Sequence, residues 1–450
     1  MGAYQPLLFG TQRINEAGHL EIGGCDAVEL AERFGTPLYV LDEQHVRERC
    51  RSYLSAFRAR VPEVEVAYAG KALMTKAVCR IVEQEGLALD VASAGELYTA
   101  LQAGFPARKI KLHGNFKSEA ELLMALRESV GRVVMDSLTE IERLSRLAQA
   151  EGKTADILLR VAPGIKTQTH TFIQTGQLDS KFGLSLSTSA AREGVRMALE
   201  LPGIKLRGLH AHLGSQLFGL DCFQTASELM VGFMASLREE FGAVLEELDL
   251  GGGLGISYTS EDMPPTIEDL AKVIVGGLRR ACAQFDYPLP RLILEPGRSI
   301  VGTAGTTLYR VGPVKEIPGV RTYVAVDGGL SDNPRPALYG AEYMALVANK
   351  AAQAPTQAVR VAGKHCETDT LLAEVTIQPV QEGDLLAVFS TGAYNYAMAS
   401  NYNRFCRPAM VLVNEGQAEI IIARETLEDL VQQDVVPERL RGNSESLSDE

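Results

Sequence analysis

The chain has 450 residues, of which 46% are hydrophobic and 22% are charged, and its formal net charge is −13. A chain of this length is too long for one ordinary core, so we expect two or three domains. The negative charge argues against nucleic acid or an anionic membrane as a partner. No apolar run reaches the roughly 18 residues that a membrane span needs, and the start, MGAYQPLLFGTQR, lacks the pattern of a secretory signal.

Seven cysteines are scattered along the chain without any CxxC spacing. An odd and dispersed set of cysteines fits reduced thiols better than a disulfide framework. We therefore expect an acidic protein of the cytoplasm, with neither nucleic acid nor a membrane among its partners.

A short apolar run followed by an amphipathic helical stretch repeats from about residue 64 onward. The apolar runs are VEVAYAG, LALDVAS, KIKLHG, RVVMDS, ILLRVAPG, LRGLHAHLGS, LEELDLGGG and RLILEPGRS. Strands that alternate with helices favour βαβ units and a parallel sheet, and eight such units match a (β/α)₈ barrel in number and size. A doubly wound open sheet is the alternative.

The barrel interpretation requires functional groups to gather where the strands end, because all strand ends meet at one mouth. In chain order the predicted strand ends carry Lys71, Asp90, His113, Asp136, Arg160, His212, the glycines 251–253 and Glu295. Some polar residue is expected wherever a strand stops. A lysine, two histidines, an arginine and carboxylates at one mouth nevertheless indicate an active site.

The sequence changes character after about residue 305, where β-branched runs are separated by Gly, Pro and Asn. These runs are TLYRVGPVKEI, TYVAVDGG, AVRVAGKHC, DLLAVFSTGAY, PAMVLVNEG and AEIIIARE, which predict an all-β domain. The N-terminal segment, with TPLYVLDEQ, carries one or two further strands that join it. We expect four regions: an N-terminal segment 1–44, a barrel 45–304, a β domain 305–436 and a disordered tail 437–450.

The glycine run GGGLG, residues 251–255, follows the seventh predicted strand. Glycines let backbone N–H groups approach an anion, and the loops after strands 7 and 8 of a barrel often hold a phosphate, although a tight turn explains such a run equally well. Ser215 and Arg298 would add a hydroxyl and a guanidinium to the same anion. A phosphate site opposite Lys71 suggests pyridoxal 5′-phosphate (PLP), whose aldehyde condenses with an amine and whose ring nitrogen needs an acidic partner, such as Glu295.

Two histidines, His210 and His212, lie two residues apart on one strand and therefore face the same side of the sheet. They form either a metal pair or a site in which His212 stacks on the PLP ring while His210 packs inside the barrel. Since no second ligand cluster stands at a suitable spacing, we expect no metal. Asp90 and Glu96 are candidates for orienting Lys71, although a helix start also explains Glu96.

These residues lie in motifs that resemble those of the diaminopimelate decarboxylases, a family in the alanine racemase-like fold class and the group of ornithine, lysine and arginine decarboxylases. The motifs, in the family's order, are YAGKA, DVASAGEL, HGNFKS, DSKFGLS, GLHAHLGSQ, LDLGGGLGI, EPGRSIVG, VDGGLSDNPRPALYG, HCETDTLL and TGAYNYAMASNYNRFCRPA. The resemblance runs from about residue 20 to 430. It implies a PLP-binding barrel, a β-rich C-terminal domain and a homodimer with shared active sites.

The resemblance also implies residue roles. Lys71 matches the lysine that binds PLP, and the other cofactor positions are Asp90, His212, Ser215, Gly253, Glu295, Gly297, Arg298 and Tyr394. The substrate positions are Arg298, Arg335, Tyr339, Glu367 and Tyr394, and Cys366 matches a proton donor supplied, with Glu367, by the second subunit.

The implied reaction is decarboxylation of meso-2,6-diaminopimelate to L-lysine and CO₂. One motif departs from the family, which usually reads CESGD where residues 366–370 read CETDT. Asp369 replaces a glycine there, which matters if the backbone needs a positive φ. The alternatives are a PLP decarboxylase of another diamino or amino acid, a PLP-binding regulatory protein without turnover, an alanine racemase and a metal-dependent barrel hydrolase.

Overall fold

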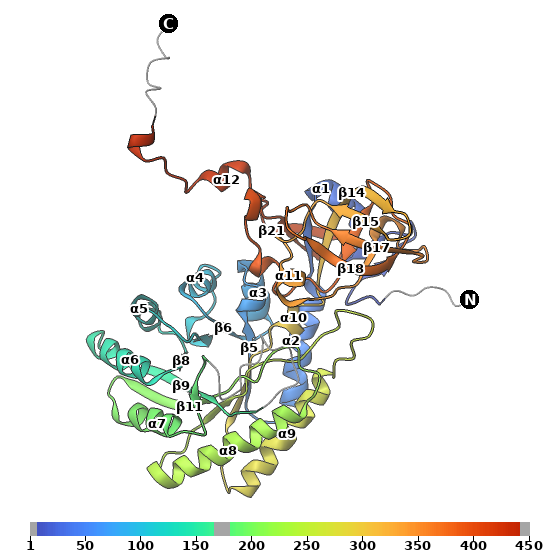
Figure 1. The fold of residues 1–450 in the computed structure, drawn as a ribbon. Helices are drawn as coiled ribbons and strands as arrows, with labels where there is room; N and C mark the ends of the chain where they lie inside the picture. Colours follow the sequence, from blue (N-terminus) through green and yellow to red (C-terminus); the bar gives the residue numbers. More distant parts are fainter. Residues whose placement is uncertain (1–6, 166–180, 442–450) are drawn as a thin grey trace.

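The structure is a computed structural model that describes residues 7–165 and 181–441. A barrel of strands and helices carries a β-rich domain at one end (Figure 1). The tail predicted for 437–450 lies largely outside the described residues, as does the start of the DSKFGLS motif. No helix in the described ranges is both long and apolar enough to cross a membrane.

The barrel consists of eight parallel strands, and its last strand pairs with its first. The strands are β5 (Val64–Ala69), β6 (Ala88–Val91), β7 (Ile110–Leu112), β8 (Arg132–Met135), β9 (Ala155–Ala162), β11 (Ile204–His210), β12 (Glu247–Asp249) and β13 (Arg291–Leu294). Closure occurs between β13 and β5, where Leu294 lies opposite Val66. The predicted (β/α)₈ barrel is therefore confirmed, and the doubly wound sheet is wrong.

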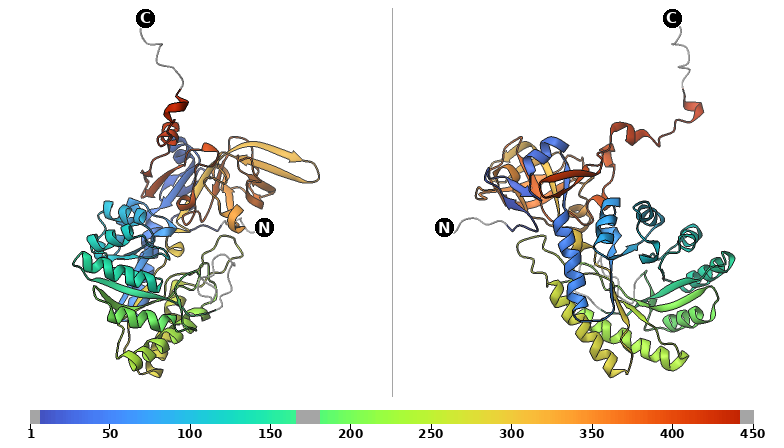
Figure 2. Two further views of the ribbon diagram at one scale, coloured as in Figure 1. Left: turned by 60° about the vertical axis from the view of Figure 1, so that its left-hand side comes forward. Right: turned by 180° about the vertical axis from the view of Figure 1, so that it is seen from behind.

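A helix follows each barrel strand, and the helices surround the barrel (Figure 2). They are α3 (Lys76–Gln84), α4 (Ala94–Gln102), α5 (Glu119–Glu128), α6 (Leu138–Ala150), α7 (Ala190–Glu200), α8 (Asp221–Phe241), α9 (Ile267–Gln284) and the short α10 (Arg298–Val301), with α2 (Glu43–Arg58) ahead of β5. Short polar residues begin several of them: Thr75, Ser93, Ser118 and Ser137 each accept a hydrogen bond from the backbone N–H three residues later. Such caps satisfy N–H groups that a helix start leaves unpaired.

The barrel interior is layered because alternate residues of every strand face inward. The end where the strands begin holds ion pairs, including Arg132 with Glu247 at 2.6 Å. Val134, Leu158 and Ile293 form an apolar middle layer. The same alternation, continued two residues further along each strand, directs polar side chains to the opposite end. The alternation of inward-facing residues therefore explains both the apolar middle layer and the polar mouth of the barrel.

The β-rich domain is built on one sheet that includes a strand from the N-terminal segment. Its strands are β4 (Leu38–Asp42), β14 (Gly305–Ile317), β15 (Arg321–Val326), β16 (Ala345–Val347), β17 (Gln357–Ala362), β18 (Thr370–Ile377), β19 (Leu385–Val388), β20 (Ala409–Asn414) and β21 (Gln417–Ile422). Strand β4 lies between β14 and β20 and pairs with both. The prediction that an N-terminal strand joins this domain is confirmed.

Smaller elements complete the structure. They are a sheet of β1 (Arg13–Ile14), β2 (Leu20–Ile22) and β3 (Cys25–Asp26), strand β10 (Leu184–Ser185) beside β9, and helices α1 (Ala27–Phe34), α11 (Arg335–Tyr339) and α12 (Leu427–Val431). The N-terminal segment thus has more strands than the one or two expected, since three of them are too short to show an alternating pattern. The limits of the four predicted regions remain a prediction.

Candidate active site

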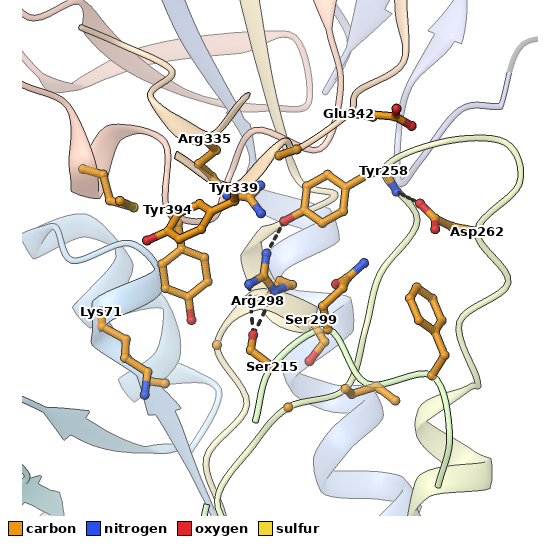
Figure 3. A pocket seen from close by; sticks show the side chains of 18 of the residues that line it. Lys71, Ser215, Tyr258, Asp262, Arg298, Ser299, Arg335, Tyr339, Glu342 and Tyr394 are labelled. Carbon is orange, nitrogen blue, oxygen red and sulfur yellow. Dashed lines mark hydrogen bonds between the residues drawn. The ribbon is translucent and has the colours of Figure 1, made fainter. Parts of the chain in front are cut away.

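A cavity of about 950 Å³ lies where the mouth of the barrel meets the β-rich domain (Figure 3). Ten of the predicted site residues line it: Lys71, His212, Ser215, Gly253, Glu295, Gly297, Arg298, Arg335, Tyr339 and Tyr394. The barrel supplies the first seven and the β-rich domain the last three. The backbone N–H of Tyr394 donates to the carbonyl of Ala72, 2.8 Å away, and fastens the two parts together beside Lys71.

Lys71 stands in a single 3₁₀ turn, Gly70–Ala72, directly after β5, and its side chain is open to the cavity. Withdrawal from bulk water lowers the pKa of its amine, but Asp90, Tyr394 and Glu295 outweigh this effect and leave the pKa raised. Asp90 is buried behind the lysine, where burial raises the pKa of its carboxyl to about 6. The amine therefore faces the cavity with carboxylates on its inner side.

Glu295 directly follows β13 and is held by two histidines from across the barrel. His210 Nε2 lies 3.1 Å from Oε2 and donates a hydrogen bond to it. His113 Nε2 lies 2.8 Å from Oε1 but is out of line, so Oε1 is a buried acceptor without a hydrogen bond. Burial alone would raise the pKa of Glu295, yet the two histidines hold it well below its usual range. Glu295 is therefore an anion that faces the cavity.

His212 follows β11, and its ring accepts a hydrogen bond from the N–H of Gly252 at Nδ1, 3.4 Å away. Burial, together with the positive charges of Lys71 and Arg160, holds the pKa of His212 well below its usual value. The ring is therefore neutral at physiological pH. A neutral imidazole suits stacking on an aromatic ring better than an imidazolium does.

Arg298 lies at the centre of the cavity wall, at the start of α10 (Figure 3). Its Nη2 donates to Ser215 Oγ at 2.9 Å, and its Nη1 donates to the hydroxyl of Tyr258 at 2.5 Å. The guanidinium also lies over the ring of Tyr394, 4.7 Å from the ring centre. These contacts fix the orientation of the guanidinium, and none of them comes from an anion.

Arg335 approaches the same cavity from α11 in the β-rich domain. Its Nη1 donates to the hydroxyl of Tyr343 at 2.6 Å, and its guanidinium lies over the ring of Tyr258, 4.7 Å from the centre. Among residues 7–165 and 181–441, neither Arg335 nor Arg298 has a carboxylate within ion-pair distance, although both are buried. Buried cations are normally paired, so the cavity is built to receive anions.

Three predicted site residues do not line the cavity. Asp90 acts on Lys71 from behind, as described above. Cys366 and Glu367 lie on an exposed loop before β18, on the β-rich domain. Glu96 accepts a hydrogen bond from the N–H of Ala92 in its own helix start, in keeping with its local interpretation.

Several residues of the site were not found from the sequence. Tyr258 contacts both arginines, but it lies in an irregular loop after the glycine run, where no periodicity marks it. His210 is buried in the barrel as expected, yet it also binds Glu295, a residue far from it in sequence. The alternation of inward residues on β11 and β13 was the only available signal for that contact.

His210 and His212 do not form a metal pair in the structure. Within the described part of the chain, the one group with the geometry for a shared ion is His113, His210 and Glu295, whose ligand atoms lie within 4.8 Å of one another. In the structure these atoms form the contacts around Glu295 described above: a hydrogen bond from His210 and an ion-pair contact with His113. His212 belongs to the cavity wall instead.

The residues present fit PLP. Glu295 offers a buried, ionised oxygen that has no hydrogen bond, as a protonated ring nitrogen requires. Gly253 has φ of +126°, and a Cβ there would lie 2.7 Å from the carbonyl oxygen of Gly214, so only glycine allows this close approach beside Ser215. Lys71, the amine required, lies on the opposite wall (Figure 3).

Comparison with known proteins agrees with this chemistry. The family described as "Pyridoxal-dependent decarboxylase, pyridoxal binding domain" matches residues 43–302. The diaminopimelate decarboxylase of Bacillus subtilis is 48% identical over 95% of this chain and 98% of its own length, and that of Synechocystis is 45% identical over 97% and 94%. The crystal structure of diaminopimelate decarboxylase from M. jannaschii with L-lysine superposes with a TM-score of 0.89 at 37% identity, covering 96% of this chain and 99% of the other.

The barrel, the cavity and the family match define a PLP-dependent decarboxylase, an enzyme of the carboxy-lyase class. Within that class the chain belongs to the diaminopimelate decarboxylase family, as its motifs predicted. A non-catalytic regulator, an alanine racemase and a metal-dependent hydrolase are not favoured by any of these relatives.

Proposed function

We propose that this protein decarboxylates meso-2,6-diaminopimelate to L-lysine and CO₂, the last step of lysine biosynthesis. The observation that carries the proposal is the pair of buried arginines, Arg298 and Arg335, that face one cavity with no carboxylate partner in the described part of the chain. A phosphate and a distal substrate carboxylate are two anions for two such cations, and guanidinium groups bind both in bidentate fashion. Lysine and ornithine carry no distal carboxylate and would leave one arginine unpaired.

PLP in this cavity supplies an electron sink for the bonding pair left at the α-carbon when CO₂ departs. Lys71 contributes the amine that holds the cofactor. Glu295 stays ionised and would favour a proton on the ring nitrogen, while the neutral ring of His212 would stack on the cofactor. Ser215 and the backbone at Gly253 bind the phosphate.

The far end of the substrate meets residues of the β-rich domain. Arg335 engages the distal carboxylate, and Tyr339 lies next to it on α11. Arg298 would serve both anions, since it contacts Ser215, which would bind the phosphate, and the ring of Tyr394. Gly297 keeps the turn before α10 narrow, because a Cβ there would lie 3.0 Å from Ala69.

The proposed site is completed by a second copy of the chain. Cys366 and Glu367 are exposed and lie outside the cavity of their own chain, so they are free to reach a neighbouring one. In a homodimer Cys366 would return a proton to the α-carbon, and Glu367 would meet the distal ammonium. The acid and the anion-binding groups would then come from different subunits.

We further propose that the protein works in the cytoplasm. All seven cysteines are free thiols, four of them buried in the core. A reducing compartment keeps such thiols unpaired.

The test is an assay of the purified protein with PLP and meso-diaminopimelate, in which CO₂ and lysine are measured by mass spectrometry. Lysine and ornithine are offered in parallel. We expect turnover of diaminopimelate alone. Decarboxylation of lysine or ornithine at a comparable kcat/KM would contradict the proposed substrate.

A further inference from the structure

The carboxylate of Asp369, three residues after Cys366, is enclosed within its own loop. The Nδ1–H of His365 donates to Asp369 Oδ2, and the backbone N–H of His365 donates to the same oxygen at 3.2 Å. The two side chains are 0% and 5% exposed, so water does not compete for these bonds. Charge-assisted hydrogen bonds of this kind, once buried, hold a loop more firmly than exposed ones do.

Two glycines make the space for this carboxylate. A Cβ on either Gly329 or Gly363 would overlap the oxygen that His365 binds. The backbone closes the ring, because Gly363 N–H donates to the carbonyl of Asp369 at 2.8 Å and Asp369 N–H donates to that of Glu367 at 2.7 Å. The backbone at Asp369 does not have a positive φ, so the residue needs no glycine there.

The other side of the His365 ring is also fixed. Ser331 N–H donates to Nε2 at 3.3 Å, which makes Nε2 the acceptor and leaves the ring proton on Nδ1, where it faces Asp369. The ring stacks on Tyr402, with 5.9 Å between ring centres, and meets the edge of Phe405 at 5.0 Å. The hydroxyl of Tyr402 donates in turn to the carboxylate of Glu367.

We propose that Asp369 and His365 are positioning residues that hold the loop carrying Cys366 and Glu367. The buried pair anchors both ends of a turn of five residues, so that Cys366 and Glu367 project outward from it. In the CETDT motif the carboxylate that holds the loop is at position 369, whereas the family usually has its carboxylate at the position of residue 370. The inference rests on the proposed function, in which the loop completes a neighbouring site.

The test compares Asp369→Ala and Asp369→Asn with Glu382→Ala, an exposed carboxylate in a turn of the same domain. Asp369→Ala should lower kcat for diaminopimelate about 10- to 100-fold, since a small misplacement of a reacting group costs that much. It should leave PLP affinity unchanged, because Asp369 does not line the cavity in which the cofactor residues lie. Asp369→Asn keeps an oxygen acceptor and should recover part of kcat, and Glu382→Ala should match the wild type.

Hydrogen exchange of the 365–369 amides, followed by mass spectrometry, supplies a readout that does not depend on turnover. Exchange there should accelerate in Asp369→Ala while the segment around Lys71 is unchanged. Unchanged exchange, or faster exchange with a wild-type kcat, would overturn the positioning role. If the wild type itself leaves diaminopimelate intact, the proposed function fails instead, and that outcome is recognised before any variant is compared.

Discussion

His210 and Glu295 share a hydrogen bond of 3.1 Å inside the barrel, where His113 and His210 together keep Glu295 the charged one of two buried carboxyl groups. Glu295 is ionised, because His113 and His210 lower its pKa more than burial raises it. The neighbouring Asp249 has its pKa raised well above the usual value, first by burial and then by the charge of Glu295, and so keeps a proton. The anion therefore points into the cavity, and the neutral acid stays behind it.

Removing this anion should slow the reaction without emptying the site. Glu295→Gln keeps the shape of the side chain but loses the charge that favours a protonated cofactor ring. We expect kcat to fall about 100-fold, the scale typical for one preorganised electrostatic contact. The absorbance spectrum of the bound PLP should shift as well. A Gln variant with normal kcat and an unchanged spectrum would exclude Glu295 as the ring-nitrogen partner.

Lys71→Ala should abolish decarboxylation, because no other amine among residues 7–165 and 181–441 lines the cavity. Borohydride treatment of the wild type should attach the pyridoxyl group to the peptide that contains Lys71, and the variant should remain unlabelled. Lys76, an exposed lysine five residues later, offers the matched control: Lys76→Ala should keep both activity and labelling. Labelling at another lysine of the wild type would refute the assignment.

The barrel was predictable because its eight strands are apolar, regularly spaced and followed by helices. The hydrophobic periodicity and the turn residues between the elements therefore indicate the same strand and helix limits. Two strands of the β-rich domain were not predicted from the sequence. Ala345–Val347 is too short to show a period, and Thr370–Ile377 does not alternate regularly between buried and exposed residues. The alternation of apolar and polar residues along a strand reflects which of its two faces is buried. Burial is irregular where a strand lies at the edge of a sheet, so the alternation is irregular there as well.

The residues of the site likewise divide into those that the sequence predicts and those that it does not. Residues placed by a strand end, such as Lys71, His212 and Glu295, could be found from the sequence because the barrel brings all strand ends together. Tyr258 could not, since its place depends on the path of a loop. The partnership of His365 with Asp369 is local in sequence, but its burial also depends on Gly329, which lies 36 residues before His365 (365 − 329).

Arg335 should set the preference for a substrate with a distal carboxylate. Losing one partner of a buried charge pair costs roughly 2–5 kcal/mol, so Arg335→Ala should lower kcat/KM for diaminopimelate by at least about 30-fold. Arg335→Lys keeps the positive charge but loses the bidentate geometry of the guanidinium, so its kcat/KM should lie between those of the wild type and Arg335→Ala. PLP affinity, measured by titration, should not change. A loss of PLP binding equal to the loss of activity would assign Arg335 to the cofactor instead.

Stability should depend on pH through Asp332, a buried residue of the β-rich domain that accepts a hydrogen bond from Gly329 N–H at 2.7 Å. Burial raises the pKa of its carboxyl from 3.8 to about 7. Because the folded pKa is the higher one, the protonated acid stabilises the fold at low pH, and this contribution is lost as pH rises through 7. The slope is at most about 1.4 kcal/mol per pH unit.

Asp332→Asn mimics the protonated acid and should remove this dependence. Urea unfolding at about pH 5 and about pH 8 measures it: relative to the variant, the wild type should lose free energy of unfolding at the higher pH. Equal changes in the two proteins would mean that Asp332 does not titrate in this range.

The proposal that two copies of the chain share each active site can be tested by complementation. Lys71→Ala and Cys366→Ala should each be inactive alone, since one loses the cofactor amine and the other the proposed proton donor. In a mixed dimer one of the two cavities combines an intact Lys71 with an intact Cys366 from the other chain, so mixing under conditions of subunit exchange should restore activity. Exchange is verified with differently tagged subunits. If tagged heterodimers form and stay inactive, Cys366 does not act across the interface.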